Sequence, residues 1–174
     1  LPICDKHQLY CSKFCLAPLL NCKQLTHLHL GRLPMEEGHF GILSYGVALS
    51  STLTTLALPH TNMTDASVAK LAAACASMSS VLSSIDFACN RIGDEGCVSL
   101  ANNLALSKRM RMVKLDGNKE ITSGGYAALA QMLEANTNIQ GLEVSAISKD
   151  ARIIIDEQLS KNRAEKTAPS AMAA

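Results

Sequence analysis

Aromatic residues and net charge are both scarce in this sequence. Only 3% of its 174 residues are Phe, Trp or Tyr, and tryptophan is absent. A core without large rings has to be filled by Leu, Ile, Val, Met and Ala, which suits many similar layers better than one large centre. The formal net charge of +1 gives no field that would steer the chain to phosphates or to an anionic membrane. We therefore expect no nucleic-acid partner and no membrane binding.

Long apolar runs are missing as well. No stretch approaches the roughly 18 consecutive apolar residues of a membrane span, and residues 1–20 mix Cys, Asp, Lys and His in a way that no secretory signal does. Because the chain begins at Leu1, we expect a processed or truncated piece. The seven cysteines are an odd number, whereas secreted disulfide scaffolds more often carry an even set. These features predict a cytoplasmic protein whose cysteines are mostly small buried residues.

What the sequence does contain is a repeated apolar triplet of the form L-x-x-L-x-L. The first members of successive triplets are 28, 29, 28 and 29 residues apart, and all fifteen positions are apolar. The end of each triplet alternates as a strand with one buried face does. The triplets are Leu25, Leu28, Leu30; Leu53, Leu56, Leu58; Leu82, Ile85, Phe87; Met110, Val113, Leu115; and Ile139, Leu142, Val144.

A second apolar pattern lies between the triplets. It consists of pairs four residues apart, a spacing typical of one face of a helix. Four residues before each pair the chain is mostly small, at Ser67, Gly96, Gly125 and Ala151, with His39 as the exception. The small residues predict a tight entry of each helix against the sheet. The pairs are Cys15/Leu19, Leu43/Val47, Leu71/Cys75, Leu100/Leu104, Leu129/Leu133 and Ile155/Leu159.

Each unit is thus expected to be a strand, a turn and a helix that must stack on its neighbours, because neither element can bury its apolar face alone. The stretch LSSIDFACNRIGDEGCVSLANNL, residues 82–104, closely resembles the ribonuclease-inhibitor-like class of leucine-rich repeat. The resemblance implies an α/β solenoid with a curved parallel sheet of about five strands and helices on its convex side. It also implies that the turn asparagines Asn90 and Asn118 satisfy backbone groups. Since Leu33 and Ile147 occupy matching places, we expect irregular turns near both ends.

We divide the chain into one repeat domain over residues 1–163 and a disordered tail over residues 164–174, where the periodicity ends. Because no complete strand precedes the first helix, we expect further repeats upstream or a partner over that edge. Within the domain, a partial first repeat over 1–24 is followed by repeats over 25–52, 53–81, 82–109, 110–138 and 139–163.

Two groups of residues have side chains that could bind a metal ion or transfer protons, and the spacing of each argues against such a role. Cys4, His7, Cys11, Cys15 and Cys22 lack the paired spacings of zinc sites, and Cys15 already fills a helix-core position. His27 and His29 project to one side of the first strand, with His60 one repeat away, but Thr55 and Ala57 lie beside them instead of a carboxylate or nucleophile. We therefore predict no enzyme, no catalytic or metal-binding residues, no cofactor and no small-molecule substrate.

The strand positions that point away from the helices are the candidate contact residues for a protein partner. In the first two repeats they are mostly small and neutral, and in the last three they are charged. Charges in the same place of consecutive units should lie on adjacent strands, although such charges can equally satisfy each other and water. The predicted partner-binding residues of the concave face are His27, His29, Asp86, Arg111, Lys114, Asp116 and Glu143.

The predicted function is non-enzymatic: an interaction or scaffold subunit that holds protein partners within a multi-subunit complex. The resemblance implies a choice among inhibitors of ribonucleases, immune receptors, regulators of actin and small GTPases, and subunits of cilia. The nearly balanced numbers of positive and negative residues favour a fixed subunit of a large assembly, ciliary or cytoskeletal, over a strongly acidic inhibitor. The alternatives are the C-terminal sensing repeats of a nucleotide-binding receptor, and a ribonuclease-inhibitor-like or GTPase-regulating binder.

Overall fold

The computed structural model describes residues 24–77, 80–145 and 149–167. Within these ranges there are five strands and five helices, which alternate along the chain. All four strand pairs are parallel, in the sequential order β1-β2-β3-β4-β5. The elements are β1 (His27–His29), α2 (Glu37–Leu49), β2 (Thr55–Ala57), α3 (Asp65–Cys75), β3 (Ser84–Asp86), α4 (Asp94–Leu104), β4 (Met112–Lys114), α5 (Ser123–Ala135), β5 (Gly141–Glu143) and α6 (Lys149–Thr167).

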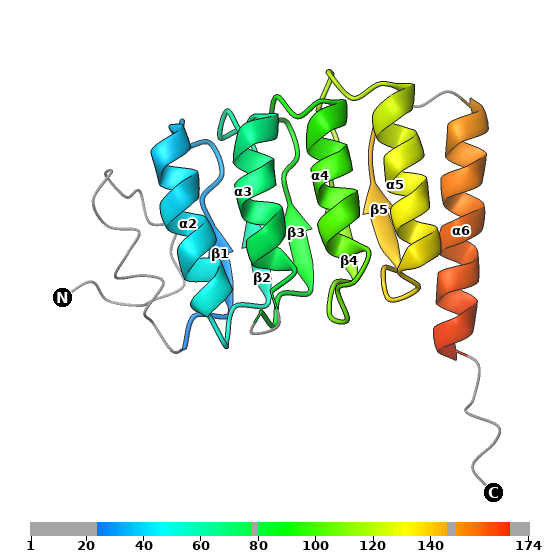
Figure 1. The fold of residues 1–174 in the computed structure, drawn as a ribbon, viewed down its shortest axis with the longest axis horizontal. Coiled ribbons are helices and arrows are strands. Elements are labelled where there is room, and N and C mark those ends of the chain that lie inside the picture. Colours follow the sequence, from blue (N-terminus) through cyan, green and yellow to red (C-terminus); the bar gives the residue numbers. More distant parts are fainter. Residues whose placement is uncertain (1–23, 78–79, 146–148, 168–174) are drawn as a thin grey trace, which may run out of the picture.

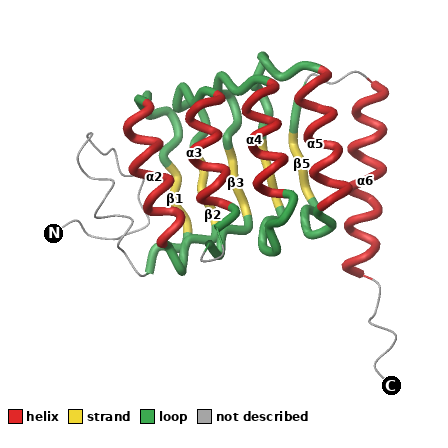
Figure 2. Tube along the Cα trace, viewed as in Figure 1, coloured by secondary structure: helices red, strands yellow, loops and turns green. Residues whose placement is uncertain are grey.

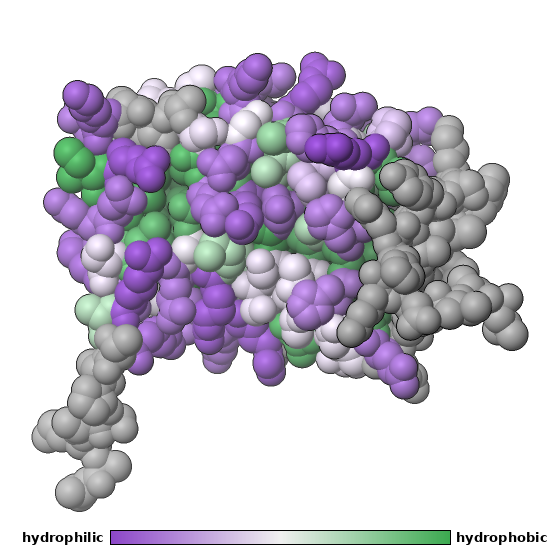
Figure 3. Space-filling view, turned by 180° about the vertical axis from the view of Figure 1, so that it is seen from behind, coloured by the Kyte–Doolittle hydropathy of each residue, from purple (hydrophilic) through white to green (hydrophobic). Residues whose placement is uncertain are grey.

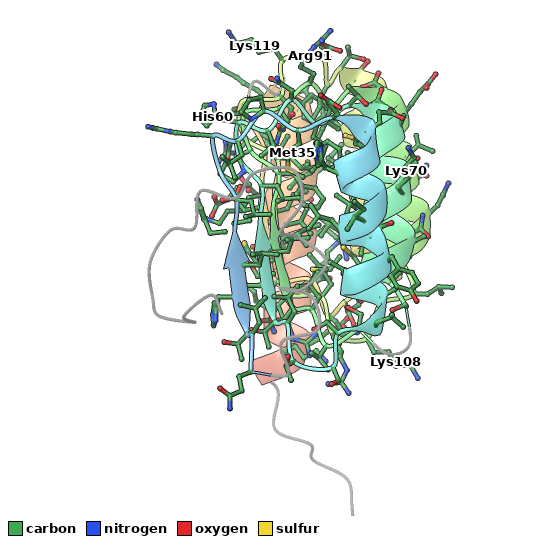
Figure 4. The ribbon with its side chains drawn as sticks, turned by 90° about the vertical axis from the view of Figure 1, so that its left-hand side faces the viewer. Met35, His60, Lys70, Arg91, Lys108 and Lys119 are labelled. Atoms are coloured by element: carbon green, nitrogen blue, oxygen red, sulfur yellow. The ribbon has the colours of Figure 1, made fainter. Side chains whose placement is uncertain are left out.

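The chain is built of two layers. The five helices stand side by side in front of the sheet in Figure 1, and turns at the two ends of each strand connect the layers in Figure 2. In the end-on view of Figure 4, the helices cover one face of the sheet and the other face carries no helix. We call this second face the open sheet face. The predicted leucine-rich repeat architecture is therefore confirmed.

The core lies between the sheet and the helices, as the two apolar patterns predict. Thirteen of the fifteen triplet residues are buried, and only Leu25 and Leu142, in the terminal repeats, are partly exposed. The helical pairs from Leu43/Val47 to Ile155/Leu159 are buried too. Phe40 and Phe87 are among the largest fully buried side chains, so two of the few rings fill the core. Each unit contributes one layer of aliphatic side chains to a continuous core.

Asparagine side chains hold the turns that follow the strands. The Asn90 amide group donates to the carbonyl oxygens of Leu58, Phe87 and Ala88, while its Oδ1 accepts hydrogen bonds from the Thr61 and Met63 amides. Asn118 repeats the arrangement one unit later: its Oδ1 accepts from the amides of Asn90 and Ile92. Both asparagines are buried, so these bonds satisfy backbone groups that water cannot reach.

The turn after β1 has no asparagine bridge, because the next unit carries Thr61 at the position that Asn90 and Asn118 occupy in the later units. The Met35 amide donates to the backbone carbonyl of Thr61, whereas the equivalent amides of Met63 and Ile92 donate to asparagine side chains. The Thr61 hydroxyl still donates to the Leu58 carbonyl oxygen. The turn at Leu33 therefore differs from its neighbours. Ile147 and the partial repeat that contains Cys15/Leu19 lie outside the described residues.

A second set of buried asparagines, which the sequence pattern did not reveal, holds the opposite ends of the units. The Asn136 amide group donates to the carbonyl oxygens of Leu104 and Ser107. The Asn162 amide group donates to those of Leu133, Asn136 and Ile139. Asn162 is fully buried although it lies late in a charged helix. It fastens α6 to the preceding repeat.

The small residues at the helix starts make room for aspartates of the preceding unit. Asp65 Oδ1 accepts a hydrogen bond from the Gly93 amide, and Asp94 Oδ1 accepts one from the Thr122 amide, each at 2.7 Å. A Cβ atom at Gly96 would lie 2.5 Å from Asp65 Oδ1, and one at Gly125 would lie 2.6 Å from Asp94 Oδ1. The predicted tight entry is confirmed, and its cause is a carboxylate that joins successive helix N-termini.

His39, the exception to the small residues, closes the N-terminus of α2. Its Nδ1 accepts a hydrogen bond from the Glu36 amide at 2.9 Å, and the Glu36 side chain accepts one from the His39 amide. This reciprocal pair is a capping box.

The C-terminal boundary needs a correction. The sequence placed a disordered tail from Ala164 onward, whereas α6 continues to Thr167. Ala164, Glu165 and Lys166 are good helix formers, and the first proline after them is Pro169. The apolar periodicity ends where α6 stops contacting the core, and the helix itself continues for a few more residues. Residues 168–174 lie outside the described part of the chain.

The described cysteines fit the core interpretation with one exception. Cys75 and Cys97 are buried, and burial raises the pKa of both thiols to about 12. Cys89 is exposed and adopts a left-handed conformation with φ 55 in the turn after β3.

None of the described helices is long and apolar enough to cross a membrane.

Replacing Asn90 with alanine should lower the free energy of unfolding by about 3 kcal/mol or more, because several buried backbone groups would lose their partner. Urea denaturation at neutral pH measures this quantity. Asn102→Ala, on the exposed face of α4, is the matched control and should stay within about 0.5 kcal/mol. Equal losses for the two variants would contradict the role of Asn90.

The contribution of Asp94 should depend on pH. Hydrogen bonds from the Thr122 hydroxyl and amide lower the pKa of Asp94 below its ordinary value of 3.8. A carboxyl group with a lowered folded-state pKa stabilises the fold above its unfolded-state pKa, and this stabilisation is lost as the pH falls through the folded-state value. Wild type should therefore exceed Asp94→Asn in unfolding free energy at neutral pH and lose the advantage below about pH 4.

Urea denaturation of both proteins between about pH 7 and pH 2 checks this prediction. Glu95→Gln is the control, because Glu95 is exposed in the same helical turn and makes no hydrogen bond or ion pair among the described residues. A difference between wild type and Asp94→Asn that stays constant down to the lowest pH would rule out the charged form of Asp94 as its source.

Candidate protein-binding surface

A column of charged side chains crosses the open sheet face at its C-terminal half. Asp86 of β3 is in register with Lys114 of β4, which is in register with Glu143 of β5. Continued toward the first strand, the same column holds Ala57 and His29. Neighbouring strands lie about 4.8 Å apart, so side chains in one column can interact. The register confirms the prediction that a negative, a positive and a negative side chain lie on three adjacent strands.

Lys114 favours one of its two acidic neighbours. Its Nζ lies 2.9 Å from Glu143 Oε2, whereas Asp86 Oδ1 accepts a hydrogen bond from the Ala88 amide. The hydrogen bond to Glu143 raises the pKa of Lys114 above its ordinary value, and the charges of Glu143, Asp86 and Asp116 add to the effect. The two side chains of the ion pair are 36% and 45% exposed, so solvent screens their attraction strongly. The ion pair therefore contributes little to the stability of the fold.

Asp116 lies just beyond β4 and adds another carboxylate to this surface. Partial burial raises the pKa of Asp116 above its ordinary value, and the carboxylates of Glu143 and Asp86 act in the same direction. The cations Lys114 and Arg152 oppose them. Asp116 lines an open pocket of about 130 Å³, which we call the Asp116 pocket. Its other lining residues are Leu142, Glu143, Val144, Arg152, Ile155 and Asp156.

Two pocket residues, Arg152 and Asp156, come from α6 and were missed by the sequence analysis. Their signal is a change within the helical pattern. Three residues before the first member of each helical pair, the earlier helices have Phe40, Val68, Cys97 and Tyr126, all buried, whereas α6 has Arg152. A buried apolar position that turns charged indicates that this side of α6 faces solvent, as in a capping element of a repeat array.

The structure separates the other predicted contact residues from the charged row. His27 and His29 are exposed on β1, at the opposite edge of the sheet, beside Thr55 and Ala57. Arg111 precedes β4, where its Nη1 donates to the carbonyl oxygens of Met110 and Asn138. The seven predicted residues thus form one group of four, Asp86, Lys114, Asp116 and Glu143, and three that lie apart.

The surroundings of the open sheet face are polar. Figure 3, which views this side, shows hydrophilic residues over much of it, with apolar residues visible between them. Figure 4 shows His60, Arg91 and Lys119 at one end of the strands and Lys108 at the other, while Lys70 lies on the helical side. Arg91 Nε lies 3.7 Å from Glu120 Oε1, and Lys70 Nζ lies 3.0 Å from Glu37 Oε2. Among the described residues, no group of three His, Cys, Asp or Glu side chains is placed to hold a metal ion.

Comparison with known proteins supports the repeat and the fold. A family model described as "Leucine Rich repeat" matches residues 79–101. The structure titled "Leiomodin-1 Actin-Binding Site 2 (ABS2)" is similar with a TM-score of 0.80 and 15% sequence identity, over 87% of this chain and 88% of that one. The tropomodulin C-terminal domain of Caenorhabditis elegans is similar with a TM-score of 0.72 and 15% identity, over 87% of this chain and 95% of that one. Curated protein sequences include no significant match.

The two faces of the sheet should respond differently to substitution. Ile85→Ala should lower the free energy of unfolding by roughly 2–5 kcal/mol, because Ile85 is fully buried and its loss leaves a cavity in the middle layer. Lys114→Met should lower it by no more than about 1 kcal/mol, because its ion pair is exposed. Urea denaturation of both variants tests the assignment, and comparable losses would show that the inner and outer faces of β3 and β4 are misassigned.

Proposed function

We propose that this chain is a non-catalytic protein-interaction module of the cytoskeleton, with actin as the first partner to test. The observation that carries the proposal is the row Asp86, Lys114, Glu143, which is partly to fully exposed and held in register on three strands of an open sheet face. Charges fixed on a rigid sheet can select a partner by complementary charge at little cost in side-chain ordering. A binding surface of this kind needs no cleft and no reactive group.

Within the part of the chain that the structure describes, the surroundings of the histidines on β1 support a binding role. His27 and His29 are neighbours of Thr55 and Ala57, so no carboxylate or nucleophile of the adjacent strand is in register with them. Proton transfer by histidine needs a partner group within hydrogen-bond reach. Among the described residues, His27 Nδ1 forms a hydrogen bond with Thr26, whose Oγ1 lies 2.9 Å away.

Actin is chosen because of the fold comparison. The similar leiomodin-1 structure is named as an actin-binding site, and it matches this chain over nearly the whole length of both. Identity of 15% makes this a similarity of fold, so actin binding is the part of the proposal that experiment has to decide. The ciliary assignment, the receptor-type alternative and the ribonuclease-inhibitor-like or GTPase-regulating binder are supported by no particular contact among the described residues.

We also infer that the repeats are of the ribonuclease-inhibitor-like class. The spacing of 28 and 29 residues, the full helix in every described unit and the asparagine bridges at Asn90 and Asn118 support this assignment. A multi-subunit assembly and a cytoplasmic location remain predictions from the sequence.

Binding to actin can be measured by cosedimentation with filaments and by fluorescence anisotropy with labelled monomers. The wild-type chain should bind one of the two forms. Lys114→Glu should change the association rate constant on the order of threefold or more, with an altered salt dependence, because it reverses the central charge of the row. Lys108→Glu, the same reversal on an exposed loop residue at the end of the strands, should leave the rate unchanged.

Failure of the wild-type chain to bind either form would remove actin as the partner. Binding that is unaffected by Lys114→Glu would instead keep actin and move the interface away from the open sheet face. Circular dichroism of both variants verifies that each is folded, because the exposed ion pair contributes only about 0–1 kcal/mol.

A further inference from the structure

The Asp116 pocket exists because the stack of units changes at α6. At earlier units, the helix residues in the places of Arg152 and Asp156 are all buried or partly buried. At α6 these places are exposed, and Arg152 Nε lies 3.3 Å from Asp156 Oδ2. The pocket opens between this ion pair and the end of β5. Its position continues the charged row of the open sheet face.

The charges around the pocket are mainly negative and unevenly paired. Asp156 has Arg152, and Glu143 has Lys114 at 2.9 Å. The Asp116 carboxylate has no ion pair within 4.0 Å and accepts no hydrogen bond among the described residues, although it is only partly exposed. A partly desolvated carboxylate beside other carboxylates is stabilised by an incoming cation. The same carboxylates would repel an anion.

The size and walls of the pocket restrict the cation. A volume of about 130 Å³ is well below the roughly 300–1,000 Å³ of pockets that hold drug-sized ligands. The apolar part of the wall comes from Leu142, Val144 and Ile155, of which Val144 and Ile155 are buried. Lysine and arginine bury an aliphatic stem along apolar surface and keep the charged end at polar groups. A bare metal ion would leave this apolar wall unused.

We propose that the Asp116 pocket receives a lysine or arginine side chain of the protein partner, with its methylene groups against Leu142 and Ile155 and its charged end at Asp116. This inference rests on the proposed function, because it specifies the chemistry of the partner. It adds a specific contact point to the charged row. The charged row selects the partner by charge complementarity, and the pocket fixes where along the sheet the partner binds.

The pocket can be tested without knowledge of the partner. Two capped tripeptides, acetyl-Gly-Lys-Gly-amide and the same peptide with norleucine in place of lysine, are titrated into the isotope-labelled chain, and the backbone amide signals are followed by NMR. Norleucine keeps an aliphatic stem and lacks the ammonium group. The lysine peptide should shift the amides of Gly117, Leu142 and Arg152 in a saturable way, and the norleucine peptide should leave them unchanged.

Asp116→Asn should weaken lysine-peptide binding about tenfold, because a hydrogen bond to a charged group is replaced by one to a neutral amide. Glu134→Gln, on the helical side, removes the same charge outside the pocket and should bind as wild type does. Amide spectra of both variants in the absence of peptide verify the fold.

Three outcomes would overturn the pocket proposal: equal shifts with the norleucine peptide, unchanged binding by Asp116→Asn, or equal weakening by Glu134→Gln. These results are independent of actin. A chain that binds actin and fails the peptide test keeps the proposed function and loses the pocket. A chain that passes the peptide test and does not bind actin keeps the pocket and needs another partner.

Discussion

The structure depends on one constraint: a single strand-helix unit cannot bury its own apolar face. Every triplet therefore packs against its own helix and against the triplets of neighbouring units, which requires parallel strands in matching register. Stacking also brings backbone groups of the turns out of water. Asn90 and Asn118 satisfy these groups at one end of the strands, and Asn136 and Asn162 do so at the other. Apolar packing and polar bridges thus repeat with the same period.

The two edges of the stack differ in chemistry. At the first described unit, α2 exposes Ile42, Tyr45 and Leu49. At the last, α6 presents Arg152 and Asp156 where earlier helices carry apolar or small residues, although its Ile153 and Ile154 are half-exposed. The polar side of α6 needs no further unit to cover it. The Asp116 pocket lies at this polar end, and Arg152 is one of its lining residues. At the position of Arg152 the earlier helices carry buried side chains instead.

Register turns a sequence repeat into a surface. Because the spacing of units matches the spacing of strands, residues 28 or 29 positions apart become neighbours on the open sheet face. Buried residues flank Asp86 and Lys114 on both sides, including Ile85 and Val113, and the buried Val144 follows Glu143. The charges can vary without loss of the core, which is why one fold serves many partners. The same reasoning explains why a match of fold at 15% identity leaves the partner to experiment.

The sequence by itself determined the period and the inner and outer faces of the strands, because these depend on local spacing, and its resemblance to a known repeat class implied the parallel sheet that places the charged row on adjacent strands. The buried triplets and the helical pairs follow from that period, and the bridges of Asn90 and Asn118 follow from the resemblance. Tertiary structure alone decided the bridges of Asn136 and Asn162, the choice of Glu143 over Asp86 by Lys114 and the Asp116 pocket. These features join side chains from different units at places where the period is broken or where two partners compete. A repeat pattern describes what successive units share, whereas contacts of this kind depend on how the individual units differ.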